Sequence, residues 1–139
     1  MNENLKRIFS NFPSDRKGTP ALEFALIAPL FFAVVFGTFE LGRGMYDKNR
    51  VAAAAALASR SLAMNPSATD SELETKILDK LDDFDPNDVT ITLTNETIAS
   101  HDFKKIEISY DFEYLINFGS HFSGVTITAT RYAPMYERT

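Results

Sequence analysis

The longest apolar stretch of the chain covers residues 21–39, and Glu23 is its only ionisable side chain. A helix of about 19 residues, rising roughly 1.5 Å per residue, spans the roughly 30 Å hydrocarbon layer of a bilayer. A secretory signal peptide has a shorter apolar region, of roughly 7–15 residues, followed by small residues at its cleavage site. The pattern therefore predicts one membrane-spanning helix that is not removed at its far end.

This helix is predicted to continue beyond the apolar stretch. Residues 41–64 contain no proline and include an alanine run at 52–56, which favours helix, whereas Pro66 ends it. Pro29 lies inside the helix and removes a backbone hydrogen bond, so we expect a bend near residues 25–29. The alanine run suits close packing, either against this protein's own domain, which we favour, or against neighbouring subunits.

The rest of the chain has the periodicities of one short helix and three strands. Ser71 and Glu74 form a candidate capping box for a helix over residues 71–84. Strict alternation of apolar and polar residues then predicts strands at 89–94, 105–114 and 125–132. Such strands have one buried face, which the second half of the long helix is expected to cover, either alone or together with the short helix. The predicted fold class is α+β, with a small three-stranded antiparallel sheet.

Composition and charge reduce the number of functional classes that the chain could belong to. The formal charge is −5, and residues 1–18 hold four basic and two acidic side chains, which leaves −7 for the remainder. An acidic main portion argues against binding to nucleic acid. There is no cysteine, so disulfides and thiolate metal ligands are excluded.

The remaining candidate chemistry is weak. Five carboxylates lie close together in the sequence, at Asp79, Asp82, Asp83, Asp85 and Asp88. A calcium loop starting at Asp83 would need glycine at its sixth position and glutamate at its twelfth, where this chain has Asp88 and Thr94. We interpret the cluster as a solvated helix end. His101 and His121 lack any metal or catalytic spacing, so we expect no metal site, no cofactor, no catalytic residues and no enzymatic activity.

An ordered set of short elements within residues 18–60 identifies a family resemblance. These elements are Gly18, the pair Glu23-Phe24, Pro29, the group Glu40-Leu41-Gly42-Arg43 and the closing Ala58-Ser59-Arg60. Together they resemble the signature of TadE-like proteins, the minor pilins or pseudopilins of tight adherence (Flp-type) pili. Residues 105–132 are similar to the weaker carboxy-terminal pattern of the same family.

The resemblance implies that a prepilin peptidase cleaves between Gly18 and Thr19. Residues 1–18 would then be a basic leader, residues 19–39 the transmembrane part of the helix, and residues 40–139 a pilin-like domain outside the cytoplasm. Glu23, Phe24 and Pro29 are the expected assembly residues. A carboxylate among apolar helices is tolerable when paired, and the free α-amine of a neighbouring subunit is the expected partner of Glu23.

The implied location is the bacterial inner membrane, with a cytoplasmic amino terminus, and incorporation into the pilus is the open alternative. Expected partners are the prepilin peptidase, other pilins and pseudopilins, the pilus assembly platform and membrane lipid. Arg43 and Arg60 match the family pattern, although an arginine beyond a membrane helix is most simply an anchor at the head groups. Alternatively, Gly18 is an ordinary linker glycine, Glu23 reaches head groups without a partner, and the chain is an uncleaved single-pass envelope protein whose outer domain binds another component or ligand.

Overall fold

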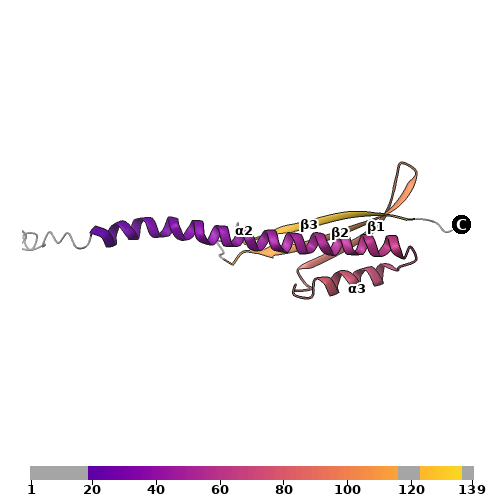
Figure 1. Cartoon of the computed structure of the whole chain (residues 1–139), viewed down its shortest axis with the longest axis horizontal. Coiled ribbons are helices and arrows are strands. Elements are labelled where there is room, and N and C mark those ends of the chain that lie inside the picture. The colour runs from indigo at the N-terminus through magenta and orange to yellow at the C-terminus, as the bar shows by residue number, and fades with distance from the viewer. Residues whose placement is uncertain (1–18, 116–122, 136–139) are drawn as a thin grey trace, which may run out of the picture. The chain divides into compact units, whose positions relative to one another are not determined.

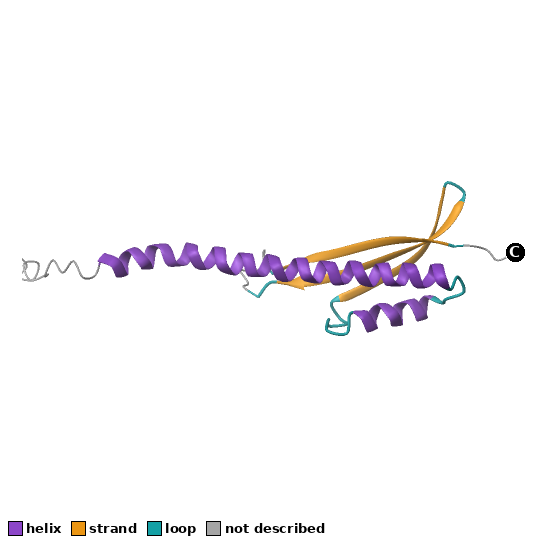
Figure 2. Cartoon of the chain, in the orientation of Figure 1, coloured by secondary structure: helices purple, strands orange, loops and turns teal. Residues whose placement is uncertain are grey.

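A computed structural model describes residues 19–115 and 123–135 (Figure 1). The elements in chain order are two helices, α2 (Thr19–Met64) and α3 (Asp70–Lys80), and three strands, β1 (Val89–Ile98), β2 (His101–Glu113) and β3 (Gly124–Pro134). Figure 2 shows the helices and strands as separate sets, which confirms the predicted α+β class. The described chain divides after Thr38 into two units, and α2 contributes residues to both.

Helix α2 is a single element of 46 residues with Pro29 in its interior. It ends at Met64, two residues before Pro66, as the sequence predicts. Proline has no N–H, so the carbonyl of Ala25 loses its usual helical partner. The helix continues through this position without a break, and the bend expected there stays a prediction.

The three strands form an antiparallel meander in the order β1-β2-β3, as predicted. Ile108 of the central strand pairs with Ile91 on one side and Ala129 on the other. Ala99 and Ser100 connect β1 to β2 with φ values of 48° and 65°. Positive φ at both central residues matches the twist that a tight hairpin requires. Each strand is longer than the strictly alternating segment that predicted it.

One face of the sheet forms the core with the second part of α2 and with α3. The buried members come from every layer: Val51, Ala54, Ala55, Ala58 and Leu62 of α2, Leu73 and Ile77 of α3, Leu81, Phe84, Ile106, Ile108 and Ala133. In Figure 1, α3 lies beside the second part of α2. The interpretation of the alanine run as packing against its own domain is therefore confirmed for Ala54 and Ala55.

The start and end of α3 differ from the prediction. Thr69, not Ser71, is the N-cap: its hydroxyl accepts from the Glu72 amide at 3.3 Å, and its own amide donates to the Glu72 carboxylate at 2.9 Å. Ser71 lies inside the helix, so the predicted box with Glu74 is wrong. The helix also ends at Lys80 rather than continuing to Phe84. Leu81 and Phe84 nevertheless remain on the buried face, because the chain turns immediately after the helix.

Candidate functional site

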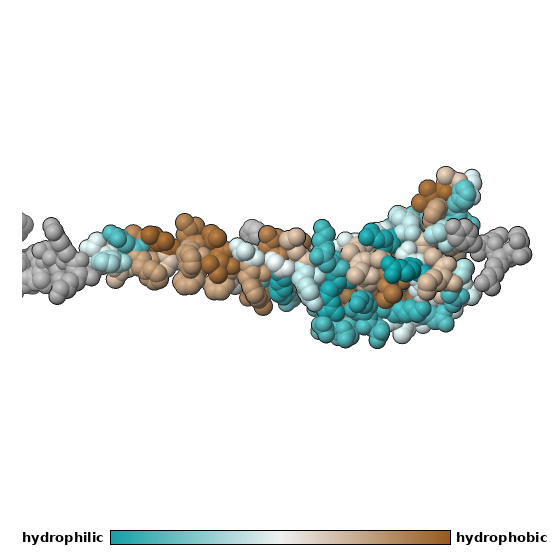
Figure 3. Space-filling model, viewed as in Figure 1, coloured by the Kyte–Doolittle hydropathy of each residue, from teal (hydrophilic) through white to brown (hydrophobic). Residues whose placement is uncertain are grey.

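The first part of α2, residues 19–38, has almost entirely exposed side chains. Helix α2 is long enough and apolar enough to cross a membrane, and none of its most apolar stretch is buried. Figure 3 shows apolar side chains over the visible surface of this stretch. Along it, the Phe32 ring contacts Phe31 and Phe36, with centroid distances of 5.6 and 6.0 Å. The Thr38 hydroxyl donates to the Val34 carbonyl at 2.8 Å, which satisfies this polar group within the helix.

The predicted assembly residues all lie on this exposed stretch. Thr19 begins α2 and Glu23 follows one turn later on the same side, since side chains four apart share a helix face. Glu23, Phe24 and Pro29 are exposed. Gly18, the other half of the predicted cleavage site, lies outside the described residues. Phe24 and Pro29 lie on the same helix as Glu23. In the described part of the chain, no positively charged group lies within ion-pair distance of the Glu23 carboxylate.

Glu40 and Arg43 form a second site, in the turn of α2 that directly follows the apolar stretch. The Glu40 carboxylate accepts from the Arg43 guanidinium at 2.9 Å and from the Leu115 amide at 2.8 Å. Arg43 also donates to the carbonyl of Glu113 and lies 4.2 Å from the centroid of the Phe112 ring. These contacts attach the end of β2 and the two residues after it to α2. We call Glu40 and Arg43 the clamp.

The surroundings of the clamp are close-packed. The Phe112 ring is buried and lies against Gly44 of α2. A side chain at Gly124 would collide with the Phe112 carbonyl, so β3 can begin here only with glycine. Burial raises the pKa of Glu40, but the hydrogen bonds from Arg43 and Leu115, with the charge of Arg43, outweigh it and hold that pKa below its ordinary value.

Arg60 lies in a different place. It lines an open groove of about 320 Å³ between α2 and α3, together with Leu57, Ser61, Met64, Lys76 and Asp79. Seventeen residues separate Arg43 from Arg60, which is roughly 25 Å along a helix. The structure therefore does not bring the two arginines together, and their assignment to a membrane interface stays a prediction.

Comparison with protein-family models gives one match. The model described as TadE-like protein matches residues 18–60. This confirms the TadE-like resemblance. The matched segment begins at Gly18, includes the exposed part of α2 and the clamp, and ends at Arg60. Neither the curated proteins nor the solved structures give a match. The family supports a protein associated with tight adherence (Flp-type) pili, with one helix that could span a membrane.

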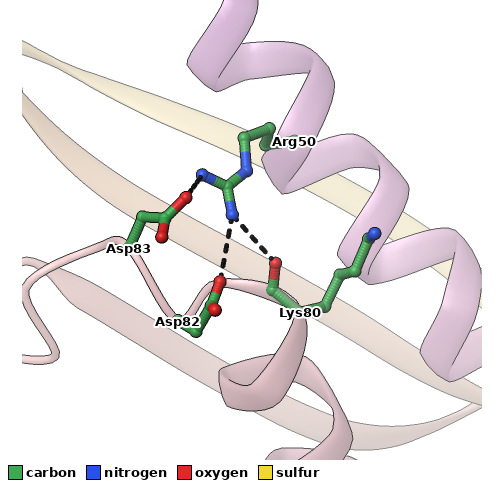
Figure 4. A network of polar contacts seen from close by, with 4 residues as sticks. All are labelled: Arg50, Lys80, Asp82 and Asp83. Atoms are coloured by element: carbon green, nitrogen blue, oxygen red, sulfur yellow. Dashed lines mark hydrogen bonds and ion pairs between the residues drawn. The ribbon is translucent and has the colours of Figure 1, made fainter.

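Arg50 is a further residue of the TadE-like segment whose contacts were not predicted. Its guanidinium donates hydrogen bonds to the carboxylates of Asp83 at 2.6 Å and Asp82 at 3.4 Å, and to the Lys80 carbonyl at 3.2 Å (Figure 4). The hydrogen bond that Arg50 donates to the Asp83 carboxylate raises the pKa of Arg50 above its ordinary value. Because Lys80 is the last residue of α3, Arg50 also places a cation at the negative end of that helix. It stacks on Phe84 as well, 4.9 Å from the ring centroid.

These contacts give part of the acidic cluster a structural role. Asp82 and Asp83 are highly exposed and pair with Arg50, consistent with a solvated helix end. Within residues 19–115 and 123–135, no group of three histidine or acidic side chains is placed to hold a metal ion. His101 is exposed and its Nδ1 contacts the Ala99 carbonyl at 3.0 Å, whereas His121 lies outside the described residues.

Sequence reasoning found the exposed helix but missed the clamp. In the sequence, the group Glu40-Leu41-Gly42-Arg43 is only a matching element of the family pattern, and it predicts no function for Glu40. The Glu40 carboxylate accepts a hydrogen bond from a backbone amide 75 residues away, and a contact with a backbone amide does not show in the pattern of side chains along the sequence. The spacing of Glu40 and Arg43, which puts opposite charges on one helix face, was the available signal.

Proposed function

We propose that this chain is a minor pilin or pseudopilin of a tight adherence pilus, which is trimmed by a prepilin peptidase and then acts in pilus assembly, initiation or tip formation. The observation that carries the proposal is the exposed apolar part of α2, within a segment that matches the TadE-like model from Gly18 onward. A helix that is apolar on all sides needs an apolar environment, supplied first by lipid and then by neighbouring subunits. Surface adhesion is the consequence of this assembly.

The proposed life cycle has two stages. Before assembly, residues 19–39 cross the inner membrane, with the leader of residues 1–18 in the cytoplasm and residues 40–139 outside it. After cleavage between Gly18 and Thr19, the assembly platform transfers the subunit from lipid into a bundle of pilin helices. Within lipid there is little hydrophobic drive for helix association, so packing and polar pairs decide it.

Glu23 supplies the polar pair in this proposal. A carboxylate at membrane depth is costly, by roughly 2.5 kcal/mol or more at a helix centre, and a neighbour's new α-amine would neutralise it. Since the amine exists only after cleavage, the pair would form only between trimmed subunits. Phe24 lies beside Glu23 on the exposed surface, and Pro29 leaves a free carbonyl one turn before it. Both features belong to the surface that neighbouring helices would contact.

The first test is the amino terminus of the membrane-bound protein. Intact-mass and amino-terminal analysis would be made on the full chain, expressed with and without its cognate prepilin peptidase. A chain that begins at Thr19 only when the peptidase is present supports the proposal. A chain that retains residues 1–18 in both cases contradicts it and favours the uncleaved single-pass envelope protein, which needs only the apolar helix.

The second test addresses Glu23. Glu23→Ala and Glu23→Gln are expected to leave membrane insertion intact and to impair piliation, because neither side chain can neutralise an amine. Leu22→Ala is the matched control, since Leu22 is a neighbouring exposed residue without charge. Piliation would be counted by electron microscopy and insertion by resistance to alkaline extraction. Normal piliation in Glu23→Gln would remove the charge pair from the proposal.

A further inference from the structure

Exposed apolar side chains at the end of the apolar stretch come from two distant parts of the chain. Phe39 and Leu41 of α2 are 63% and 66% exposed, and Leu115, which follows β2, is 64% exposed. The Leu115 amide donates to Glu40, so this residue lies against the helix at the level of Glu40. Phe39 and Leu41 are the sequence neighbours of Glu40 and project about 100° to either side of it. We call Phe39, Leu41 and Leu115 the collar.

The clamp fixes the contribution of Leu115 to this collar. Glu40 binds the Leu115 amide directly, and Arg43 binds both Glu40 and the Glu113 carbonyl while stacking on Phe112. The side chains of Glu40 and Arg43 are only 17% and 30% exposed. A charge-assisted hydrogen bond that is largely shielded from water is stronger and more directional than an exposed one. Leu115 is thus held in one place on the helix although its own side chain is uncovered.

The surroundings of the collar indicate what covers it. The collar continues along α2 into the stretch that is long and apolar enough to cross a membrane, and that stretch is exposed on all sides. One turn further along α2 come the Arg43 guanidinium and the exposed ring of Tyr46. Cationic and tyrosine side chains next to an apolar stretch are typical of the boundary between acyl chains and head groups.

We propose that the collar contacts the membrane surface, and that Glu40 and Arg43 are positioning residues that hold Leu115 in it. The inference rests on the proposed membrane insertion of α2. It assigns a lipid contact to Leu115, which is far from the apolar helix in the sequence. It also gives the Glu40-Arg43 pair of the TadE-like segment a function in orienting the domain's base on the bilayer.

The experiment uses the absence of cysteine from the chain, because any introduced thiol is then the only one to label. Leu115→Cys would carry an environment-sensitive fluorophore, in the full chain reconstituted in vesicles of phosphatidylethanolamine and phosphatidylglycerol. Some of the lipids would bear a nitroxide quencher, attached near the head group for the labels at residues 92 and 115, and midway along the acyl chain for the label at residue 31, which lies near the middle of the apolar stretch. Phe31→Cys marks the apolar stretch, and Thr92→Cys marks an exposed position on β1. We expect the labels at residues 31 and 115 to be quenched and the label at 92 to remain bright.

The outcomes separate this inference from the proposed function. A bright label at residue 31 would mean that α2 is not in the bilayer, and both ideas would fail. Quenching at residue 31 with a bright label at 115 would overturn the collar alone. The collar would also be overturned if quenching at residue 115 decreased as the protein density in the vesicles rose, because the collar would then contact a second copy of the chain.

The positioning role is tested in the Leu115→Cys background. Glu40→Ala is expected to reduce quenching at residue 115 to the level of residue 92, since the Leu115 amide loses its acceptor. Glu40→Gln is expected to retain the quenching, because its amide oxygen still accepts that hydrogen bond. Arg50→Ala removes a comparable network elsewhere in the domain and should leave residue 115 quenched. Unchanged quenching in Glu40→Ala, or equal loss in Arg50→Ala, would show that the clamp does not position Leu115.

Discussion

The two parts of α2 are continuous in backbone but opposite in packing. Residues 19–38 carry large apolar side chains all round and bury none of them fully, whereas the buried residues of α2 all lie between Val51 and Leu62. In the second part the inward residues are mostly small, and polar side chains such as Lys48 and Asn49 face outward. The two parts of α2 can therefore lie in different surroundings although their backbone is continuous. The side-chain pattern decides whether a stretch packs on its own sheet or requires an apolar exterior.

The largest expected effect contrasts two leucines of this helix. Leu62 is 2% exposed and Leu30 is 70% exposed. Leu62→Ala should destabilise the domain by about 2–5 kcal/mol, because it leaves a cavity in the core. Leu30→Ala should change the free energy of unfolding by less than about 0.5 kcal/mol. Urea unfolding of the full chain in detergent, followed by near-ultraviolet circular dichroism, measures both. Equal effects would mean that the first part of α2 also packs on the domain.

A second contrast enlarges alanines instead of shortening leucines. Ala55 is fully buried and Ala33 is exposed. Ala55→Leu should cost about 1–3 kcal/mol through overpacking, whereas Ala33→Leu should leave domain stability unchanged. The same unfolding measurement applies. If Ala55→Leu were tolerated, the close approach of α2 to the sheet would not depend on the small side chain.

The regular elements were predictable because their patterns repeat. The long helix was expected from residue 21 to 64, and α2 runs from Thr19 to Met64. The alternation of Ile106 and Ile108 placed both on the buried face, where they lie. The cap of α3 was not decidable by the same means, because Thr69 with Glu72 and Ser71 with Glu74 have the same spacing. In the structure Thr69 has extended backbone and caps the helix, whereas Ser71 already lies inside it.

Contacts between distant residues were beyond sequence reasoning. Lys104 is buried on the inner face of β2, where its ammonium group pairs with Asp70 at 2.7 Å. A lysine there contradicts the apolar pattern, and only the position of α3 explains it. The clamp depends in the same way on the Leu115 amide and the Glu113 carbonyl. Of the candidate site, the exposed apolar helix was predictable from composition, and the contacts that hold the end of β2 were not.

A smaller contrast concerns two cations on the outer part of the packed helix. Arg50 bonds Asp82, Asp83 and the end of α3, whereas Lys48 is exposed. Arg50→Ala should lower the free energy of unfolding by about 0.5–1 kcal/mol, since both carboxylates are largely in water. Lys48→Ala should have no measurable effect. Added salt should reduce the difference between the two variants, because it screens exposed ion pairs. A loss that is independent of salt would instead assign the effect to the stacking on Phe84.

The smallest expected effect is the pH dependence contributed by Glu40, which lies where the two parts of α2 meet. The contacts with Arg43 and Leu115 hold the pKa of Glu40 in the folded protein below its ordinary value of 4.5. A carboxyl with a depressed pKa stabilises the fold above that ordinary value, and the contribution is lost as the pH falls through the folded pKa.

The measurement is the stability of wild type minus that of Glu40→Gln, from neutral pH down into the acid range. The difference should be positive at neutral pH and shrink as Glu40 becomes protonated. Burial raises the pKa of Asp47, about two turns further along α2, which gives the opposite pH dependence. Because Asp47 is present in both proteins, its contribution cancels in the difference. A difference that stays constant with pH would mean that Glu40 acts only as a neutral hydrogen-bond acceptor, and that the clamp needs its oxygen but not its charge.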